Sequence, residues 1–275
     1  MTPAALVYTL VLAAVFGLVI GSFLNVVVYR VPAGIPLTRE SRCPACDAPV
    51  RAWQNVPVLS WMLLRGRCAT CRTAISARYP LVEVATALAF LGVVWAATER
   101  VAIAGVDASS IGVLLAYLWL AAVSVALTLI DLDTQRLPNA IVLPSYVVAF
   151  GLFAVAASLG ADPMGLVRAA VGAAAMYGFY ALLRLIRPDG MGGGDVKLAG
   201  VLGMYLGWVG WGALAVGGFA AFVLGGLYGV AVIIARRAGR RDAIPFGPWM
   251  LAGAWLGIAA GEPLAQAYVR WAIGA

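Results

Sequence analysis

The chain has 275 residues, of which 63% are apolar and only 11% are charged, whereas soluble domains are less apolar and about twice as highly charged. It contains no histidine, which excludes the Ser-His-Asp triad, a Ser-His dyad and the histidine-based zinc proteases and leaves proton transfer mainly to carboxylates. The net charge of +7 agrees with the preference of Lys and Arg for the cytoplasmic loops of membrane proteins. We therefore expect the chain to lie in a lipid bilayer and not to bind nucleic acid.

Eight apolar segments predict an all-α polytopic membrane protein. Crossing the hydrocarbon core takes about 20 apolar residues, and the first segment, Ala4–Val28, is long enough to be a transmembrane helix rather than a cleaved signal peptide. Seven more segments follow a long polar loop: Leu81–Thr98, Ile111–Ile130, Ala140–Leu159, Gly165–Ile186, Val196–Trp208, Ala213–Ala235 and Phe246–Ala267. The sixth segment is short and rich in glycine, so its end near Gly207–Gly212 is the least defined boundary.

The 19 cations predict the orientation of the chain. With the N-terminus outside, the cytoplasmic side receives the cations of the first loop, of Arg136, of Arg184–Lys197 and of Arg236–Arg241. Only Arg100, Arg168 and Arg270 then lie outside, as the positive-inside rule requires. We therefore expect both termini outside and three parts: a first transmembrane helix (residues 1–29), a cytoplasmic domain (30–79) and a seven-helix membrane core (80–275).

The four cysteines of the long loop form two Cys-x-x-Cys pairs, Cys43 with Cys46 and Cys68 with Cys71. Four thiolates arranged in this way suit tetrahedral zinc. The alternative is two disulfides, but these rarely persist in the reducing cytoplasm, where the charge pattern places this loop. We expect a structural zinc that uses all four cysteines and stabilises a loop too small to bury a sufficient core.

Two aspartates stand at the ends of predicted membrane helices. Asp131 ends the third segment and Asp195 begins the sixth, and because two complete crossings separate them, both return to the same membrane face and could meet. Two adjacent carboxylates cannot both ionise, so one keeps a proton while the other acts as a base toward water, as in aspartic proteases. Asp133 lies in a polar stretch two residues after Asp131. If the helix continues that far, its side chain points about 200° away from that of Asp131 around the helix axis. We predict Asp131 and Asp195 as the catalytic pair.

Three glycines, Gly192, Gly193 and Gly194, precede Asp195. The alternative role for Asp195 is a simple cap of the sixth helix, beside its positive end. Consecutive glycines cost backbone entropy, however, and are typical of places where another backbone approaches closely or a left-handed conformation is needed. We expect an extended peptide substrate to be that backbone, with the glycines and Lys197 supporting it.

Glu83 lies three residues into the second apolar segment. An acid at this depth needs a partner, and we expect Arg51 or Arg78 to reach it. The loop before it is rich in aromatic and cationic residues, which would also suit anionic lipid headgroups.

Motifs in order along the chain resemble those of the bacterial type IV prepilin peptidases over almost its whole length. The residues that carry the resemblance are Gly21–Pro32, the two cysteine pairs, Leu63–Cys68, Ile75–Glu83, Asp131 with Leu137-Pro138-Asn139, Gly190–Asp195 and Pro245–Pro248.

The resemblance implies a GxGD-type intramembrane aspartic protease of the bacterial inner membrane, with Gly192–Asp195 as the motif and Asp131 as the second acid. Such enzymes remove the basic leader of type IV prepilins and type II secretion pseudopilins after a glycine, on the cytoplasmic side. Members with the four-cysteine loop then methylate the new N-terminus with S-adenosylmethionine. Relatives commonly carry an acidic residue in place of Gln54, so methylation is less firmly implied than cleavage. No stable partner besides these substrates is implied.

Two other classes remain open from the residues alone. An ion- or proton-coupled transporter with a structural zinc module could bind its cation at Asp131, Asp195 and Glu83, although the related halves common in transporters are not visible in the sequence. If the protein were only a membrane-anchored zinc scaffold, Asp131 and Asp195 would have no functional role. Incubation with a prepilin peptide separates these classes, because only the peptidase shortens it.

Overall fold

The computed structural model describes residues 2–104, 107–235 and 245–274. The chain divides into two units, each described by itself: unit 1 comprises residues 1–110 and 117–126, and unit 2 comprises residues 111–116 and 127–275. The cationic run Arg236–Arg241 and the side chain of Arg100, both used in the orientation prediction, lie outside the described residues.

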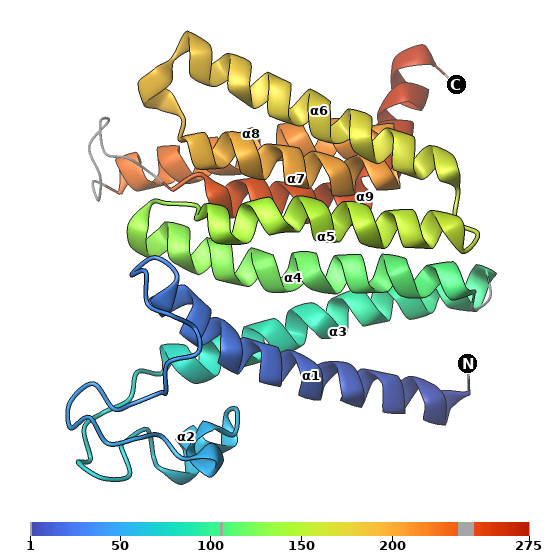
Figure 1. Ribbon diagram of the computed structural model, residues 1–275. Coiled ribbons are helices and arrows are strands. Elements are labelled where there is room, and N and C mark those ends of the chain that lie inside the picture. The colour runs from blue at the N-terminus through green and yellow to red at the C-terminus, as the bar shows by residue number, and fades with distance from the viewer. Residues whose placement is uncertain (1, 105–106, 236–244, 275) are drawn as a thin grey trace. The chain divides into compact units, whose positions relative to one another are not determined.

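Each predicted membrane segment corresponds to a long helix (Figure 1). These helices are α1 (Pro3–Arg30), α3 (Arg78–Ala104), α4 (Ala108–Thr134), α5 (Asn139–Ser158), α6 (Pro163–Ile186), α7 (Gly193–Val209), α8 (Trp211–Ile234) and α9 (Gly247–Ile273). Within the described ranges there is no strand, only two isolated β-bridges in the four-cysteine loop. The all-α architecture is therefore confirmed.

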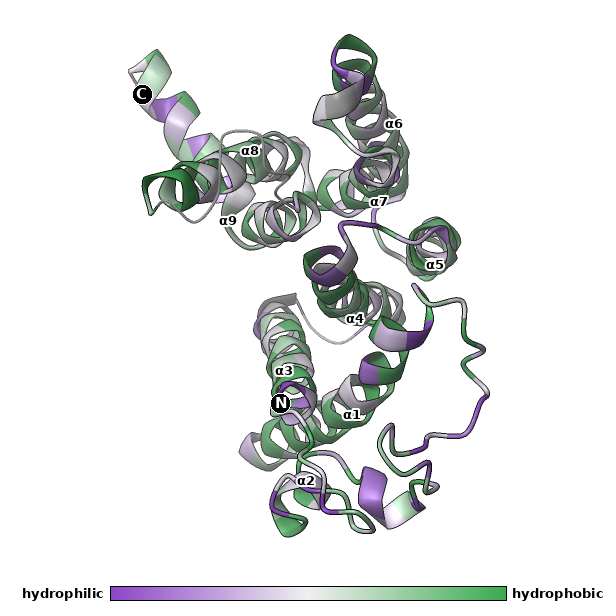
Figure 2. Cartoon of the chain, turned by 90° about the vertical axis from the view of Figure 1, so that its left-hand side faces the viewer, coloured by the Kyte–Doolittle hydropathy of each residue, from purple (hydrophilic) through white to green (hydrophobic). Residues whose placement is uncertain are grey.

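Six of these helices are long and apolar enough to cross a membrane, namely α1, α3, α4, α5, α6 and α8. In Figure 2 the helices are coloured mainly as apolar, and hydrophilic residues appear at helix ends and in the connecting segments. Of the other two, α7 has only 17 residues, and α9 contains Glu262 and an internal Pro263, which lower its mean hydropathy.

In unit 1, α1 and α3 pack through glycines on one face of α1. A Cβ added to Gly17 would lie 2.6 Å from the Cα of Ala87, and one added to Gly21 would lie 2.6 Å from the Cα of Glu83. Small residues spaced by four allow two helix backbones to approach closely. The loop that follows α1 is held by Arg30, whose guanidinium donates to several carbonyl oxygens, including that of Leu37 at 2.9 Å.

In unit 2, α7 is the central helix. It contacts α5, α6, α8 and α9, and every residue from Leu198 to Gly207 is buried. Where α6 crosses α7, an added Cβ at Gly203 would overlap the carbonyl oxygen of Gly172. Because α7 is enclosed by protein, it does not need the length and hydropathy of a lipid-facing helix. The aspartate at its first turn is thereby placed at one end of the most enclosed element of unit 2.

Candidate active site and metal centre

Asp131 lies in the last turn of α4 and is almost completely buried, with 4% of its surface exposed. Its Oδ2 accepts a hydrogen bond from the backbone N–H of Gly247, at the start of α9, over 2.9 Å. The helix continues to Thr134, so Asp133 turns away and is exposed. The expected difference between the two aspartates is therefore present.

Asp195 occupies the first turn of α7, where its Oδ2 accepts a hydrogen bond from the backbone N–H of Gly192 over 3.0 Å. This is the reciprocal contact of a capping box, so the capping role that we weighed as the alternative is present locally. A cap does not require a second acid, however. Asp195 is close enough to Asp131 for the two carboxylates to interact electrostatically, as an acid–base pair requires.

The glycines before Asp195 differ from our expectation in their backbone conformation. Gly192 has φ −69°, and none of the three has a positive φ, so the suggestion of a left-handed conformation is wrong. Close approach does occur, but to side chains of this chain. A Cβ on Gly194 would lie 2.8 Å from the Cβ of Leu137, and one on Gly193 would overlap the Arg184 guanidinium.

Lys197 joins the start of α7 to α5. Its Nζ donates to Oδ1 of Asn139 over 2.9 Å, and its carbonyl oxygen accepts from the Tyr146 hydroxyl over 2.7 Å. Asn139 ends the Leu137-Pro138-Asn139 motif, so the motif that follows Asp131 is tied directly to the helix of Asp195. Lys197 thus links the first turns of α7 to α5.

Gly247 is a site residue to which the sequence analysis assigned no role. Besides its hydrogen bond to Asp131, it leaves no room for a side chain, because an added Cβ would lie 2.8 Å from Oδ2 of Asp131. The only signal in the sequence was the Pro245–Pro248 motif. A backbone donor has no side-chain signature, so its partner could not be inferred from residue type.

Glu83 is buried, with 7% of its surface exposed, and has a partner that we did not expect. Its Oε2 accepts a hydrogen bond from the backbone N–H of Val58 over 2.7 Å, and the Ser22 side chain also bonds to it. Val58 immediately precedes the short helix α2 (Leu59–Leu63). Glu83 therefore fixes the loop to α3 within unit 1.

The four cysteines converge in the loop of unit 1. Their sulfur atoms all lie within 4.8 Å of one another, and the Sγ atoms of Cys43 and Cys71 are 3.8 Å apart. Tetrahedral zinc with Zn–S bonds of about 2.3 Å requires sulfur atoms about 3.8 Å apart. The cluster can therefore bind a metal ion.

The two cysteine pairs have matching turns, as expected of two halves of one metal site. The N–H of Cys43 donates to the carbonyl of Ala48 over 2.9 Å, and the N–H of Cys68 donates to that of Thr73 over 2.8 Å. The residue after the second cysteine has a positive φ in each pair, 55° at Asp47 and 62° at Arg72. The Sγ of Cys71 also forms a hydrogen bond with the Thr73 hydroxyl over 3.2 Å, and hydrogen bonding with Thr73 lowers the pKa of the Cys71 thiol to about 6.

Comparison with known proteins assigns the chain to a family. Residues 15–97 match the model of the bacterial peptidase A24 N-terminal domain, and residues 118–230 match that of the type IV leader peptidase family. The chain is 38% identical to a prepilin leader peptidase/N-methyltransferase of Pseudomonas putida, over 96% of this chain and 94% of that protein. The chain belongs to the type IV leader peptidase family.

Two further relatives extend the match within this family. Proteins named prepilin leader peptidase/N-methyltransferase from Neisseria gonorrhoeae and Aeromonas hydrophila are 37% and 36% identical to the chain, each over 94% of this chain and 93% of the relative. No solved structure gives a significant match. Membership of the type IV leader peptidase family does not support the transporter alternative.

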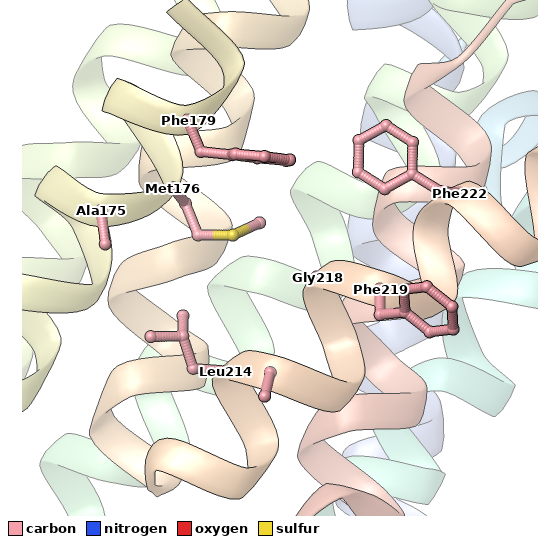
Figure 3. A pocket seen from close by; sticks show the side chains of 8 residues that line it. Ala175, Met176, Phe179, Leu214, Gly218, Phe219 and Phe222 are labelled. Carbon is pink, nitrogen blue, oxygen red and sulfur yellow. The ribbon is translucent and has the colours of Figure 1, made fainter. Parts of the chain in front are cut away.

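An apolar groove of about 330 Å³ lies between α6 and α8 in this family member. Figure 3 shows Phe179 of α6 and Phe222 of α8 pointing towards one another across it, and their ring centroids are 6.0 Å apart. The other side chains of its lining are also apolar. The groove therefore lacks the polar groups that would recognise a nucleoside-like methyl donor.

Proposed function

We propose that the chain is an intramembrane aspartic endopeptidase that removes the basic leader of type IV prepilins or pseudopilins after a glycine and then methylates the new N-terminus. The observation that carries this proposal is the pair Asp131 and Asp195. The two come from different helices, lie within electrostatic range of each other, and occur in a chain of the type IV leader peptidase family.

The chemistry follows from two carboxylates that share one proton. The ionised aspartate takes a proton from water, whose oxygen bonds to the scissile carbonyl carbon. The protonated aspartate gives its proton to the leaving nitrogen as the C–N bond breaks. The N–H groups of Gly247 and Gly192 hold one oxygen of each carboxylate, which fixes the pair before the substrate arrives.

The methyltransferase activity is supported by the names of the relatives, with S-adenosylmethionine as the methyl donor. Gln54, where relatives commonly carry an acid, has a structural role in this chain. Its Oε1 accepts a hydrogen bond from the backbone N–H of Arg51 over 2.9 Å, which closes the first turn of the short helix η1 (Ala52–Asn55). A carboxylate could accept the same bond, so the amide preserves the local fold.

The four-cysteine cluster is proposed to hold one structural zinc ion. All four positions of the tetrahedron would be cysteine sulfurs, so no position is open for catalysis. The ion would join the two matching turns and thereby stabilise the loop between α1 and α3, which contains few buried residues.

We place the protein in the bacterial inner membrane, with the four-cysteine domain and the aspartates facing the cytoplasm and both termini outside. The cation distribution supports this orientation. It also gives prepilins, whose basic leaders remain in the cytoplasm, direct access to the aspartate pair.

Cleavage of a prepilin peptide by the purified protein tests the proposal. We expect a product that begins immediately after the glycine, and no product from an Asp195→Asn variant with the same thermal unfolding temperature as the wild type. Proton or cation flux through vesicles that contain the protein, without any cleavage, would instead support the transporter alternative.

A further inference from the structure

Tyr180 of α6 has a hydroxyl group that the fold buries without a partner. Its side chain is 0% exposed, and among the described residues no group forms a hydrogen bond with its hydroxyl oxygen. Buried polar groups are nearly always paired, because an unpaired one lowers stability, and phenylalanine would fill the same space without that cost. The stability of the fold therefore does not explain why this position carries a tyrosine rather than a phenylalanine.

Two sets of contacts place Tyr180 beside the aspartate pair. Its ring packs near that of Phe246, with centroids 6.4 Å apart, and Phe246 directly precedes Gly247, the donor to Asp131. One helical turn further along α6, the guanidinium of Arg184 lies against Gly193. Tyr180 also interacts electrostatically with Asp195. These contacts place Tyr180 near the residues that hold the aspartate pair.

The surroundings of the Tyr180 ring are apolar. Its ring centroid lies 5.7 Å from that of Phe179 and 5.4 Å from that of Phe222, the two aromatic residues that face each other across the groove (Figure 3). Hydrogen bonds are electrostatically stronger in such a water-poor environment. A donor at this place would therefore stabilise negative charge more strongly than the same donor in water.

Cleavage of a peptide bond needs a donor for the carbonyl oxygen, on which negative charge develops. Two backbone N–H groups of the site are already bonded to the carboxylates, that of Gly192 to Asp195 and that of Gly247 to Asp131. Tyr180 provides a donor that no carboxylate occupies.

We propose that Tyr180 is a further catalytic residue, whose hydroxyl donates a hydrogen bond to the carbonyl oxygen of the scissile peptide bond. This inference rests on the proposed endopeptidase function. When the water oxygen bonds to the carbonyl carbon, the π electron pair of the carbonyl moves to its oxygen, and the phenol stabilises that charge without losing its proton. When the C–N bond breaks, the electron pair returns and the leaving nitrogen takes a proton from the protonated aspartate.

Kinetics of Tyr180→Phe on a prepilin peptide test this role, with Tyr177→Phe as the matched control. Tyr177 lies three residues earlier on the same helix and is 45% exposed. Because the hydrogen bond strengthens only as charge develops, Tyr180→Phe should lower kcat by about 100-fold and leave KM within about twofold. Since the variant also loses an unpaired buried hydroxyl, its thermal unfolding temperature should not fall. Tyr177→Phe should keep the wild-type kcat.

The inference is overturned if Tyr180→Phe keeps the wild-type kcat, or if its loss of activity comes with a lower unfolding temperature or a raised KM. The wild type and Asp195→Asn separate this outcome from failure of the proposed function. If the wild type cuts, Asp195→Asn does not and Tyr180→Phe is fully active, only the role of Tyr180 is wrong. A wild type that does not cut the peptide overturns the endopeptidase and the role of Tyr180 together.

Discussion

Replacement of Asp131 by asparagine, compared with the same change at Asp133, tests which aspartate pairs with Asp195. The asparagine side chain keeps an oxygen that can accept the hydrogen bond from the Gly247 N–H. In the wild type the Gly247 nitrogen lies 2.9 Å from Oδ2 of Asp131. A hydrogen bond to a charged acceptor contributes about 1.5–3 kcal/mol and one to a neutral acceptor about 0.5–1.5 kcal/mol, so the free energy of unfolding should fall by only about 1 kcal/mol. Asp131→Asn should therefore fold.

Activity should respond far more strongly than stability. Loss of a general acid or base lowers turnover by about 10²- to 10⁴-fold, so Asp131→Asn should show almost no cleavage. Asp133 is exposed and faces about 200° away on the same helix, so Asp133→Asn should retain most of the turnover. The assay is the initial rate of both variants on one prepilin substrate, with circular dichroism to verify folding. An inactive Asp133→Asn beside an active Asp131→Asn would show that this assignment is wrong.

The purified protein should contain about one zinc per chain by elemental analysis, and Cys43→Ser or Cys68→Ser should lower the zinc content and the stability of the loop; intact disulfides without metal, in protein from a reducing cytoplasm, would contradict this. Asp195→Asn should still methylate a pre-cleaved peptide, as measured by mass spectrometry, and a folded variant unable to do so would show that the two activities share a site. Gly21→Leu should lower the free energy of unfolding by about 1–3 kcal/mol, because an added Cβ lies 2.6 Å from the α3 backbone. The control Gly92→Leu, where nothing lies within 4 Å of an added Cβ, should leave the unfolding temperature unchanged.

The helices were predictable because long apolar runs give a strong and local signal. Their ends shifted by a few residues, as at α7, which begins at Gly193 rather than at Val196. The central position of α7 was not predictable, since a short, glycine-rich segment can be either a poor membrane helix or an enclosed one. Only the packing of α5, α6, α8 and α9 around it distinguishes the two.

The convergence of side chains was predictable from the sequence, whereas their backbone hydrogen-bond donors were not. The spacing of Cys43, Cys46, Cys68 and Cys71 predicted that four sulfur atoms converge, and they do. Glu83 accepts a hydrogen bond from the N–H of Val58, and the sequence analysis had considered no backbone donor for it. Every residue except proline offers a backbone N–H, so residue type alone cannot identify such donors.

The hydrogen bond from Gly247 to Asp131 joins residues 116 positions apart in the chain. A ribosome that has inserted α4 into the membrane must therefore still synthesise four helices before this aspartate receives its partner. Until α9 arrives, a nascent chain contains both aspartates but lacks the donor that fixes one of them. The Asp131 carboxylate can therefore take up this hydrogen bond only after the start of α9 has been synthesised.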